Sequence, residues 1–190
     1  LKNRRYLFYT LELAFAMAIL FAYIAASPFI IQQHYGFGPF AFSLFFAANA
    51  MAIGVGAAAS VRFGSPRHCL FVSCAGMTLC SLALAAVMAA GTSVVWFEVL
   101  LFALCFMMGL SFTVATALAM DAARRQAGTA SAFMGASGFL SGSIVSPLAG
   151  LGNIMVSTGI ILVVSALGAS LFAFWAVKAE KTAAGEAVDE

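Results

Sequence analysis

Charged side chains are scarce in this sequence. Asp, Glu, Lys and Arg together make up 8% of its 190 residues, whereas a soluble domain carries about 25%. Hydrophobic residues account for 64% of the chain, and the mean hydropathy is +1.05. A globule of this size needs far more charge to cover its surface with groups that water solvates. The composition therefore excludes a soluble domain and predicts a polytopic membrane protein.

Histidine and cysteine are also rare, which argues against a metal centre or a disulfide framework. The two histidines, His34 and His68, lie in connectors without a second ligand nearby in the sequence. The four cysteines form no CxxC pair and lie inside apolar runs, at Cys69, Cys74, Cys80 and Cys105. A net charge of +2 with no basic stripe argues against nucleic acid as a partner. We expect no metal ion, no cofactor and no nucleic-acid partner, with the cysteines as small core residues.

Long apolar runs are what the sequence does contain. Six of them can be read, at residues 7–31, 40–61, 69–90, 94–120, 128–151 and 154–177. At about 1.5 Å per residue in a helix, each is long enough to cross a bilayer core of about 30 Å. The sequence therefore predicts an all-α membrane protein with one six-helix transmembrane bundle, residues 1–177. The polar residues 178–190, of mixed charge, are predicted to be a disordered cytoplasmic tail.

The nine Lys and Arg residues all lie outside these runs and in every second connecting segment. They are Lys2, Arg4, Arg5, Arg62, Arg67, Arg124, Arg125, Lys178 and Lys181. With six crossings, all nine lie on the same side of the membrane, which the positive-inside rule assigns to the cytoplasm. We therefore predict a multi-pass protein of the cell inner membrane with both termini cytoplasmic. Because the chain does not begin with methionine, we also expect it to be a fragment of a longer reading frame.

Acidic side chains are rarer still inside the runs. Glu12 lies well inside the first run, and buried membrane acids often mark ion or substrate pathways. Two interpretations stay open: Glu12 takes part in proton coupling, or it has a structural role in which it reaches back to the cytoplasm or pairs with Arg5. Glu98 lies near a helix start, where a negative charge suits the helix dipole, and is expected to anchor that end. Asp121 lies three and four residues before Arg124 and Arg125, and a local ion pair is expected there.

Polar and proline residues within the runs are further candidate sites. Asn49 lies near the middle of the second run, and its amide needs either a neighbouring helix or a ligand as partner. Tyr23 and Ser27, one helical turn apart, form a second polar patch. Pro28 and Pro147 each remove a helical hydrogen bond in the outer third of their runs. We expect these two prolines to be bend points of an outward-side gate.

Small residues recur every three or four positions between Gly128 and Gly150 and form one slowly rotating helical face. Such a face lets neighbouring membrane helices pack closely. The same run contains GxSG around Ser137, a sequence that six-helix intramembrane serine proteases of the rhomboid type also carry. That chemistry needs a histidine within hydrogen-bond reach of the serine, and no histidine follows Ser137. We therefore expect the chain not to be an enzyme, with an intramembrane serine protease as the weakest alternative.

Residues 127–152, AGTASAFMGASGFLSGSIVSPLAGLG, resemble the eleventh helix of major facilitator drug exporters of the Bcr/CflA type. The segments NRRYLFYTL, AYIAASPFIIQQHYGFGPFAFSLFFAANA and LAMDAARRQ resemble the same branch. Together they correspond to the C-terminal six helices of a twelve-helix transporter, without the N-terminal six. The family's cytoplasmic loop motif survives only in part, as Arg62-Phe63-Gly64 with Arg67 downstream, and Val61 stands where the family has an acid.

This resemblance implies a fold of two 3+3 inverted repeats, with substrate bound near the bilayer midplane between two halves. It implies export of drugs or other small amphipathic molecules, in exchange for protons. The expected partners are the lipid bilayer, the N-terminal six-helix half, a drug-like small molecule and protons. The first, second, fourth and fifth helices would line the cavity, with substrate-binding candidates Tyr23, Ser27, Phe46, Asn49, Met134 and Ser137. The alternative is a self-standing six-helix membrane protein that acts as a dimer.

Overall fold

The computed structural model describes the backbone of residues 3–186 and the side chains of residues 3–180. Within these residues the chain is helical throughout, and six helices are long and apolar enough to cross a membrane. They are α1 (Arg4–Pro28), α2 (Pro39–Ala59), α3 (Pro66–Ala90), α4 (Val94–Ala122), α5 (Ala127–Ala149) and α6 (Ile154–Glu186). A π-helix, η1 (Phe29–His34), continues α1, and two short 3-10 helices, η2 (Ser60–Arg62) and η3 (Arg124–Gln126), adjoin α2 and α5. The predicted all-α, six-helix membrane fold is confirmed.

Local sequence signals begin and end several of these helices. The side chains of Asn3, Ser65 and Asn153 accept hydrogen bonds from the first backbone N–H groups of α1, α3 and α6. These groups otherwise lack an intrahelical partner. Pro66 occupies the first helical position of α3, where the missing N–H costs nothing. Gly91 ends α3 with a φ of 62°, in the left-handed region that glycine adopts without strain.

The last helix is longer than the sequence predicts. Residues 178–186, expected to belong to a disordered tail, continue α6 as helix as far as Glu186, and residues 187–190 lie outside the described part. The side chain of Glu180 supplies a physical reason, because it bonds to residues of α1 and α3. A polar composition therefore did not prevent the helix from continuing, since tertiary contacts hold this end in place.

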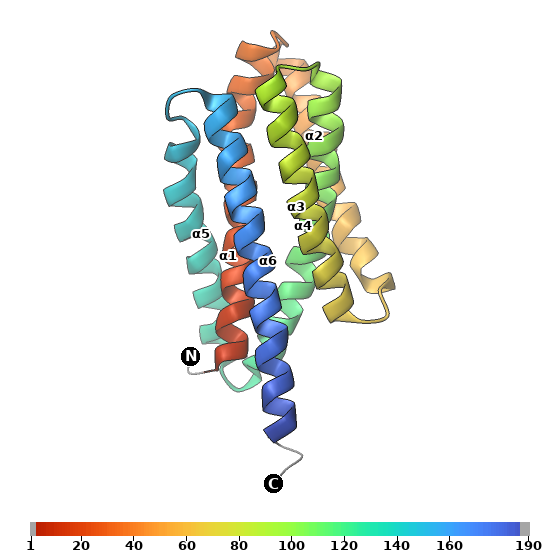
Figure 1. Ribbon diagram of the computed structural model, residues 1–190, viewed down its shortest axis with the longest axis vertical. Helices are drawn as coiled ribbons and strands as arrows, with labels where there is room; N and C mark the ends of the chain where they lie inside the picture. Colours follow the sequence, from red (N-terminus) through yellow and green to blue (C-terminus); the bar gives the residue numbers. More distant parts are fainter. Residues whose placement is uncertain (1–2, 187–190) are drawn as a thin grey trace.

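The helices pack as two equivalent sets of three (Figure 1). Helix α1 packs against α4, α5 and α6, while α4 packs against α1, α2 and α3; α3 and α6 also pack together. Exchanging α1, α2 and α3 for α4, α5 and α6 reproduces these six main pairs. Because α1 and α4 cross the bundle in opposite directions, the two sets are inverted relative to each other. This is the arrangement of two 3+3 inverted repeats.

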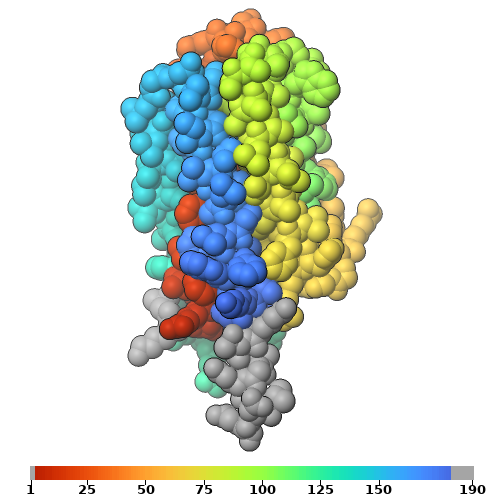
Figure 2. Space-filling model, viewed as in Figure 1, coloured from red at the N-terminus to blue at the C-terminus, as the bar shows by residue number. Residues whose placement is uncertain are grey.

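Small residues allow the closest helix contacts in both sets. A Cβ atom added to Gly56 of α2 would collide with the backbone of α4 at Phe106, and one added to Gly109 would collide with the Ile53 carbonyl. On the equivalent side, Gly142 of α5 packs against the ring of Phe21 in α1. Helices α1 and α4 are the most buried spans, whereas α2 and α5 are the least buried. In the space-filling view, α3 and α6 meet along one face of the bundle (Figure 2).

Candidate functional site

Glu12 is fully buried where α1, α3 and α4 meet. Its Oε1 accepts a hydrogen bond from the Ser111 hydroxyl at 2.5 Å and one from the Cys74 thiol at 3.7 Å. Its other carboxyl oxygen is buried without a hydrogen-bond partner. The alternative of a pair with Arg5 is not formed, because Arg5 pairs with Glu180 and Asp121. One carboxyl oxygen of Glu12 thus has two hydrogen-bond donors, and the other is free to accept a proton. Because Glu12 forms no ion pair among the described side chains, none has to break when a proton binds or leaves.

A second carboxyl, that of Glu98, also points into the bundle. The Asn49 amide of α2 donates a hydrogen bond of 2.7 Å to its Oε1. The Asn49 side chain is fully buried, and neither Asn49 Oδ1 nor Glu98 Oε2 has a hydrogen-bond partner. The sequence predicted an anchoring role for Glu98 near the start of α4, and the structure adds a bond to a buried amide of α2. Residue spacing along one helix could not show that a buried amide from another helix would lie beside this carboxyl.

An aromatic pair lies next to these two polar side chains. The rings of Tyr23 and Phe46 stack with centroids 5.8 Å apart and an interplanar angle of 20°, and Phe42 contacts Phe46 at 5.8 Å. The Tyr23 phenol lies beside the Asn49 amide and the Glu98 carboxyl. We call Tyr23, Phe46, Asn49 and Glu98 the outer cluster. It contains three of the six predicted substrate-binding residues; their role in binding stays a prediction.

Ser27 adjoins the outer cluster through Tyr23. Both side chains line a small internal cavity of about 10 Å³ between α1, α3, α4 and α6. The hydroxyls of Ser27 and of Thr158, which lines the same cavity, are buried without a hydrogen-bond partner. A space of this size has room for about one water molecule, which two free hydroxyls would bind. Ser27 is therefore close to the outer cluster, but it faces the packed interior of the bundle.

Met134 and Ser137 are not part of the outer cluster. They lie on α5, whose main packing partner is α1. The Ser137 hydroxyl donates to the Met134 carbonyl of its own helix at 2.9 Å.

The rings of His34 and His68 pack against Tyr35 and Phe63 at opposite ends of the bundle. Within the described residues Ser137 thus has no histidine beside it, and no group of three His, Cys, Asp or Glu could hold a metal ion.

The two prolines lie at the same end of the bundle, opposite the start of α1 (Figure 1). Pro28 is the last residue of α1, and the chain continues from it as the π-helix η1. A change from α to π geometry often marks a functional site in a helix. Pro147 lies two residues before the end of α5. Their proposed action as bend points stays a prediction.

The opposite end of the bundle carries a network of ion pairs, most of which the sequence did not reveal. Figure 1 shows that the connections after α2 and α4 lie at the same end as the start of α1 and the last part of α6. There Glu180 pairs with Arg5 at 2.5 Å and with Arg67 at 2.8 Å, and it accepts a hydrogen bond from Tyr9 at 3.2 Å. Asp121 pairs with Arg5 at 3.6 Å and also with Arg124, as predicted.

A sequence signal for Glu180 does exist. Ala166, Ala169, Ala173 and Ala176 are buried and follow one another at spacings of three or four, which places them on one face of α6. Glu180 continues this spacing and is itself buried. An acid on a packed helix face needs a partner, and three basic segments lie at this end. The segment that contains Glu180 is rich in Ala and of mixed charge, so its composition predicted a disordered tail and not a continuation of the helix.

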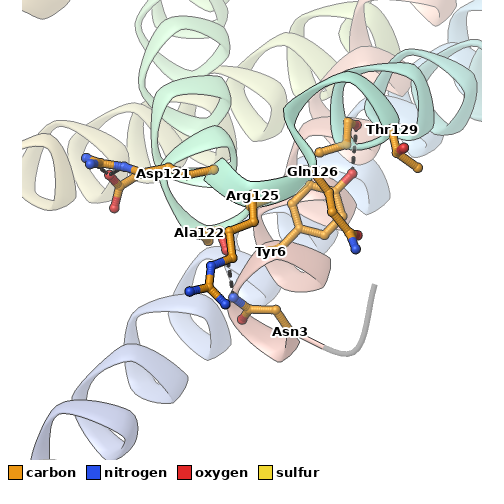
Figure 3. A pocket seen from close by; sticks show the side chains of 10 residues that line it. Asn3, Tyr6, Asp121, Ala122, Arg125, Gln126 and Thr129 are labelled. Atoms are coloured by element: carbon orange, nitrogen blue, oxygen red, sulfur yellow. Dashed lines mark hydrogen bonds and ion pairs between the residues drawn. The ribbon is translucent and has the colours of Figure 1, made fainter.

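A cavity of about 270 Å³ opens at the same end, between the start of α1 and the connection from α4 to α5 (Figure 3). Two hydrogen bonds of 2.8 Å close its base, from the Asn3 amide to the Ala122 carbonyl and from the Tyr6 hydroxyl to the Ala130 carbonyl. These bonds tie α1 to the connection that precedes α5. The cavity is thus part of the joint between the two inverted repeats.

The comparisons with known proteins agree with this architecture. The family model described as Major Facilitator Superfamily matches residues 1–147. A relative from Bacillus subtilis (strain 168), described as the uncharacterized MFS-type transporter YdgK, is 32% identical over 182 residues. The aligned region covers 94% of this chain and 45% of the relative. The chain therefore spans less than half the length of the curated relative that it matches.

Proposed function

Because the chain belongs to the Major Facilitator Superfamily, a family of membrane transporters, we propose that it forms the C-terminal six-helix half of a twelve-helix exporter. The cargo is a drug or another small amphipathic molecule, and the driving force is an exchange for protons. The resemblance of residues 127–152 to the eleventh helix of Bcr/CflA-type exporters supports the choice of branch. The 45% coverage of the relative supports the assignment as one half.

The observation that carries this proposal is the incomplete burial of α2 and α5. These helices are the least buried spans, and each presents glycines with nothing within 4 Å of an added Cβ: Gly54 on α2, Gly128 and Gly135 on α5. Glycine in a membrane helix usually marks a place where another helix comes close. A second bundle that packed against α2 and α5 would cover these positions and enclose a cavity between the halves.

For proton coupling, we propose Glu12. It is an acid in a membrane span, fully buried, hydrogen-bonded to Ser111 and without a cationic partner. Acids in such positions of transporters commonly take up and release protons during the cycle. The substrate-binding role of the predicted residues and the gate function of Pro28 and Pro147 belong to the same proposal.

For location, we propose the cell inner membrane with both termini in the cytoplasm. The nine Lys and Arg residues lie in segments that the six crossings place on one side, which is the side the positive-inside rule makes cytoplasmic. A cysteine at Gly36 should then react with a membrane-impermeant maleimide from outside intact cells, and one at Gly64 should react only after lysis. The reverse labelling pattern would contradict the orientation.

The transport proposal is tested by drug susceptibility in a cell that lacks its own drug pumps. The 190-residue chain is expressed alone and, in a second strain, within the complete transporter that includes the other half. We expect resistance to several amphipathic drugs from the complete transporter only, and its loss when a proton ionophore collapses the gradient. Resistance from the chain alone would favour the alternative of a dimer of this six-helix unit. No resistance from either form would contradict drug export.

A further inference from the structure

Among the side chains of residues 3–180, Glu98 forms no ion pair. The six Arg residues that the structure describes and Lys178 lie in the segments at the other end of the bundle. The ion pairs of the described residues involve Asp121 and Glu180 at that end. A carboxyl in a membrane span normally faces a cation, a cavity or the interior of a bundle. A cation that pairs with Glu98 would therefore come from outside these residues.

The pair formed by Glu98 and Asn49 also has two acceptor atoms without a hydrogen-bond partner. The one side-chain partner of Glu98 is the Asn49 amide nitrogen, and this contact sets the amide orientation, because a flipped amide would bring two oxygens together. Asn49 Oδ1 and Glu98 Oε2 then remain as two buried acceptors without a donor. Leaving such atoms unsatisfied is costly. A ligand that carries N–H donors and a positive charge would satisfy both.

Aromatic rings border the same position. Tyr23 and Phe46 are stacked, and Phe42 extends the aromatic surface along α2. Ring faces attract cations and also bind flat apolar groups. Phe42 and Phe46 are only partly buried, so part of this surface is accessible from outside the packed bundle. Charge, acceptors and aromatic rings from α1, α2 and α4 thus converge at one place.

We propose that the outer cluster is a recognition site for the protonated amine of an aromatic organic cation, with Glu98 and Asn49 as hydrogen-bond acceptors and Tyr23 and Phe46 as the aromatic wall. This inference rests on the proposed export function and names a substrate class for it. The Glu98 carboxylate and the Asn49 carbonyl accept the N–H groups, and the aromatic part of the ligand lies against the rings. The ion pair forms away from water, where its electrostatic attraction is strongest.

The test measures binding of three matched probes to the purified complete transporter in lipid nanodiscs. The probes are naphthylmethylammonium, its uncharged analogue naphthylmethanol, and the trimethylammonium analogue, which is charged but has no N–H group. We expect the primary ammonium to bind about tenfold more tightly than the alcohol. The trimethylammonium compound should bind between the two, because it keeps the charge and loses the hydrogen bonds. Equal binding of the ammonium and the alcohol would overturn the proposal.

Substitutions in the outer cluster test whether this cluster causes the preference for the ammonium over the alcohol. Glu98→Gln should reduce the affinity for the ammonium about tenfold and leave that for the alcohol unchanged within about twofold. Asp121→Asn removes a carboxylate at the other end of the bundle and should not alter the preference. Glu98→Asp and Phe46→Leu are the milder changes if Glu98→Gln does not fold. The first should retain a preference for charge, and the second should reduce it severalfold. A wild-type preference in both Glu98→Gln and Phe46→Leu would overturn the proposal.

Failure of this inference is distinguishable from failure of the export function. Binding is measured without a gradient, and drug resistance is measured in cells. A transporter that confers resistance to neutral drugs but binds the ammonium no better than the alcohol contradicts the cation site and leaves export standing. A protein that shows the Glu98-dependent preference but confers no resistance contradicts export and supports the site.

Discussion

Glu12 and Glu98 lie inside the membrane-spanning part of the chain, and their neighbours differ. Glu12 accepts hydrogen bonds from a hydroxyl and a thiol in the packed interior. Glu98 accepts from the Asn49 amide beside two partly buried aromatic rings. A carboxyl enclosed by the bundle exchanges only small species such as protons, whereas one beside accessible rings can meet a larger ligand. The two acids therefore suit different steps of one transport cycle.

The first prediction concerns proton coupling through Glu12. Glu12→Gln keeps the size of the side chain and its acceptor for Ser111, but it cannot release a proton. In everted vesicles containing the complete transporter, we expect this variant to lose the acceleration of drug export by a pH gradient. Exchange of drug down its own gradient should persist. Ser73→Ala is the matched control for a polar change in the core, since Ser73 is buried and bonds the Leu70 carbonyl of its own helix. Normal gradient-driven export by Glu12→Gln would remove Glu12 from the coupling step.

At the same scale, the sequence could identify candidate residues more readily than their partners. Asn49 and Tyr23 stand out because polar groups are rare in apolar runs, and the structure places them together. For Glu98, the position near a helix start predicted an anchor at the interface and did not show the bond to Asn49. Its true neighbour depends on how α2 and α4 are rotated against each other. That rotation depends on the close approach at Gly56 and Gly109, which cannot be read from either helix alone.

Among the helices, the contact between α2 and α4 can be tested with two glycines of the same helix. Gly56→Ala should destabilise the bundle by about 1–3 kcal/mol, because the added methyl group collides with the backbone at Phe106 and cannot be accommodated by a side-chain rotation. Gly54→Ala, two residues earlier, adds the same methyl group where nothing lies within 4 Å. It should change stability by no more than about 0.5 kcal/mol. Unfolding in mixed micelles by increasing SDS measures both, and equal stabilities would contradict the predicted contact.

The end of α6 gives a second prediction at the helix scale. Glu180→Gln removes the charge that pairs with Arg5 and Arg67. Partly exposed ion pairs each contribute up to about 1 kcal/mol, so local opening of this end should become about fivefold more frequent. Hydrogen exchange of the backbone after Val177 should increase accordingly, while exchange in the middle of α6 stays unchanged. Arg4→Gln, which changes the charge at the same end outside this network, serves as control. Unaltered exchange in Glu180→Gln would show that these pairs do not hold the helix end.

The helix ends also show where reading a sequence succeeds and where it stops. The start of α3 follows from Ser65 and Pro66, since caps and prolines act locally. The continuation of the first span as a π-helix beyond Pro28 and the extension of α6 to Glu186 do not follow in this way. Both depend on contacts or geometry that arise only in the assembled bundle.

For the molecule as a whole, substitutions on the exposed face of α5 can show whether the chain is one half of a transporter or a six-helix bundle surrounded only by lipid. Gly135 has open space around it, and the proposed second half would pack there. Gly135→Trp should therefore leave the 190-residue chain folded in micelles, because Gly135 is exposed and nothing lies within 4 Å of a Cβ added there. In the complete transporter the same ring would separate the two bundles and should reduce export at least about tenfold.

Leu171→Trp is the matched control, since Leu171 is an exposed residue of α6, which packs with α3 on a different face of the bundle from α5. There a tryptophan would face lipid and should leave export unchanged. Full export by both variants would mean that α5 also faces lipid, and the twelve-helix assembly would then need a different interface. Loss of export only in Gly135→Trp, with the isolated chain still folded, requires a second bundle against α5. Since α2 is equivalent to α5 in the inverted repeat, the same substitution at Gly54 should then have the same effect.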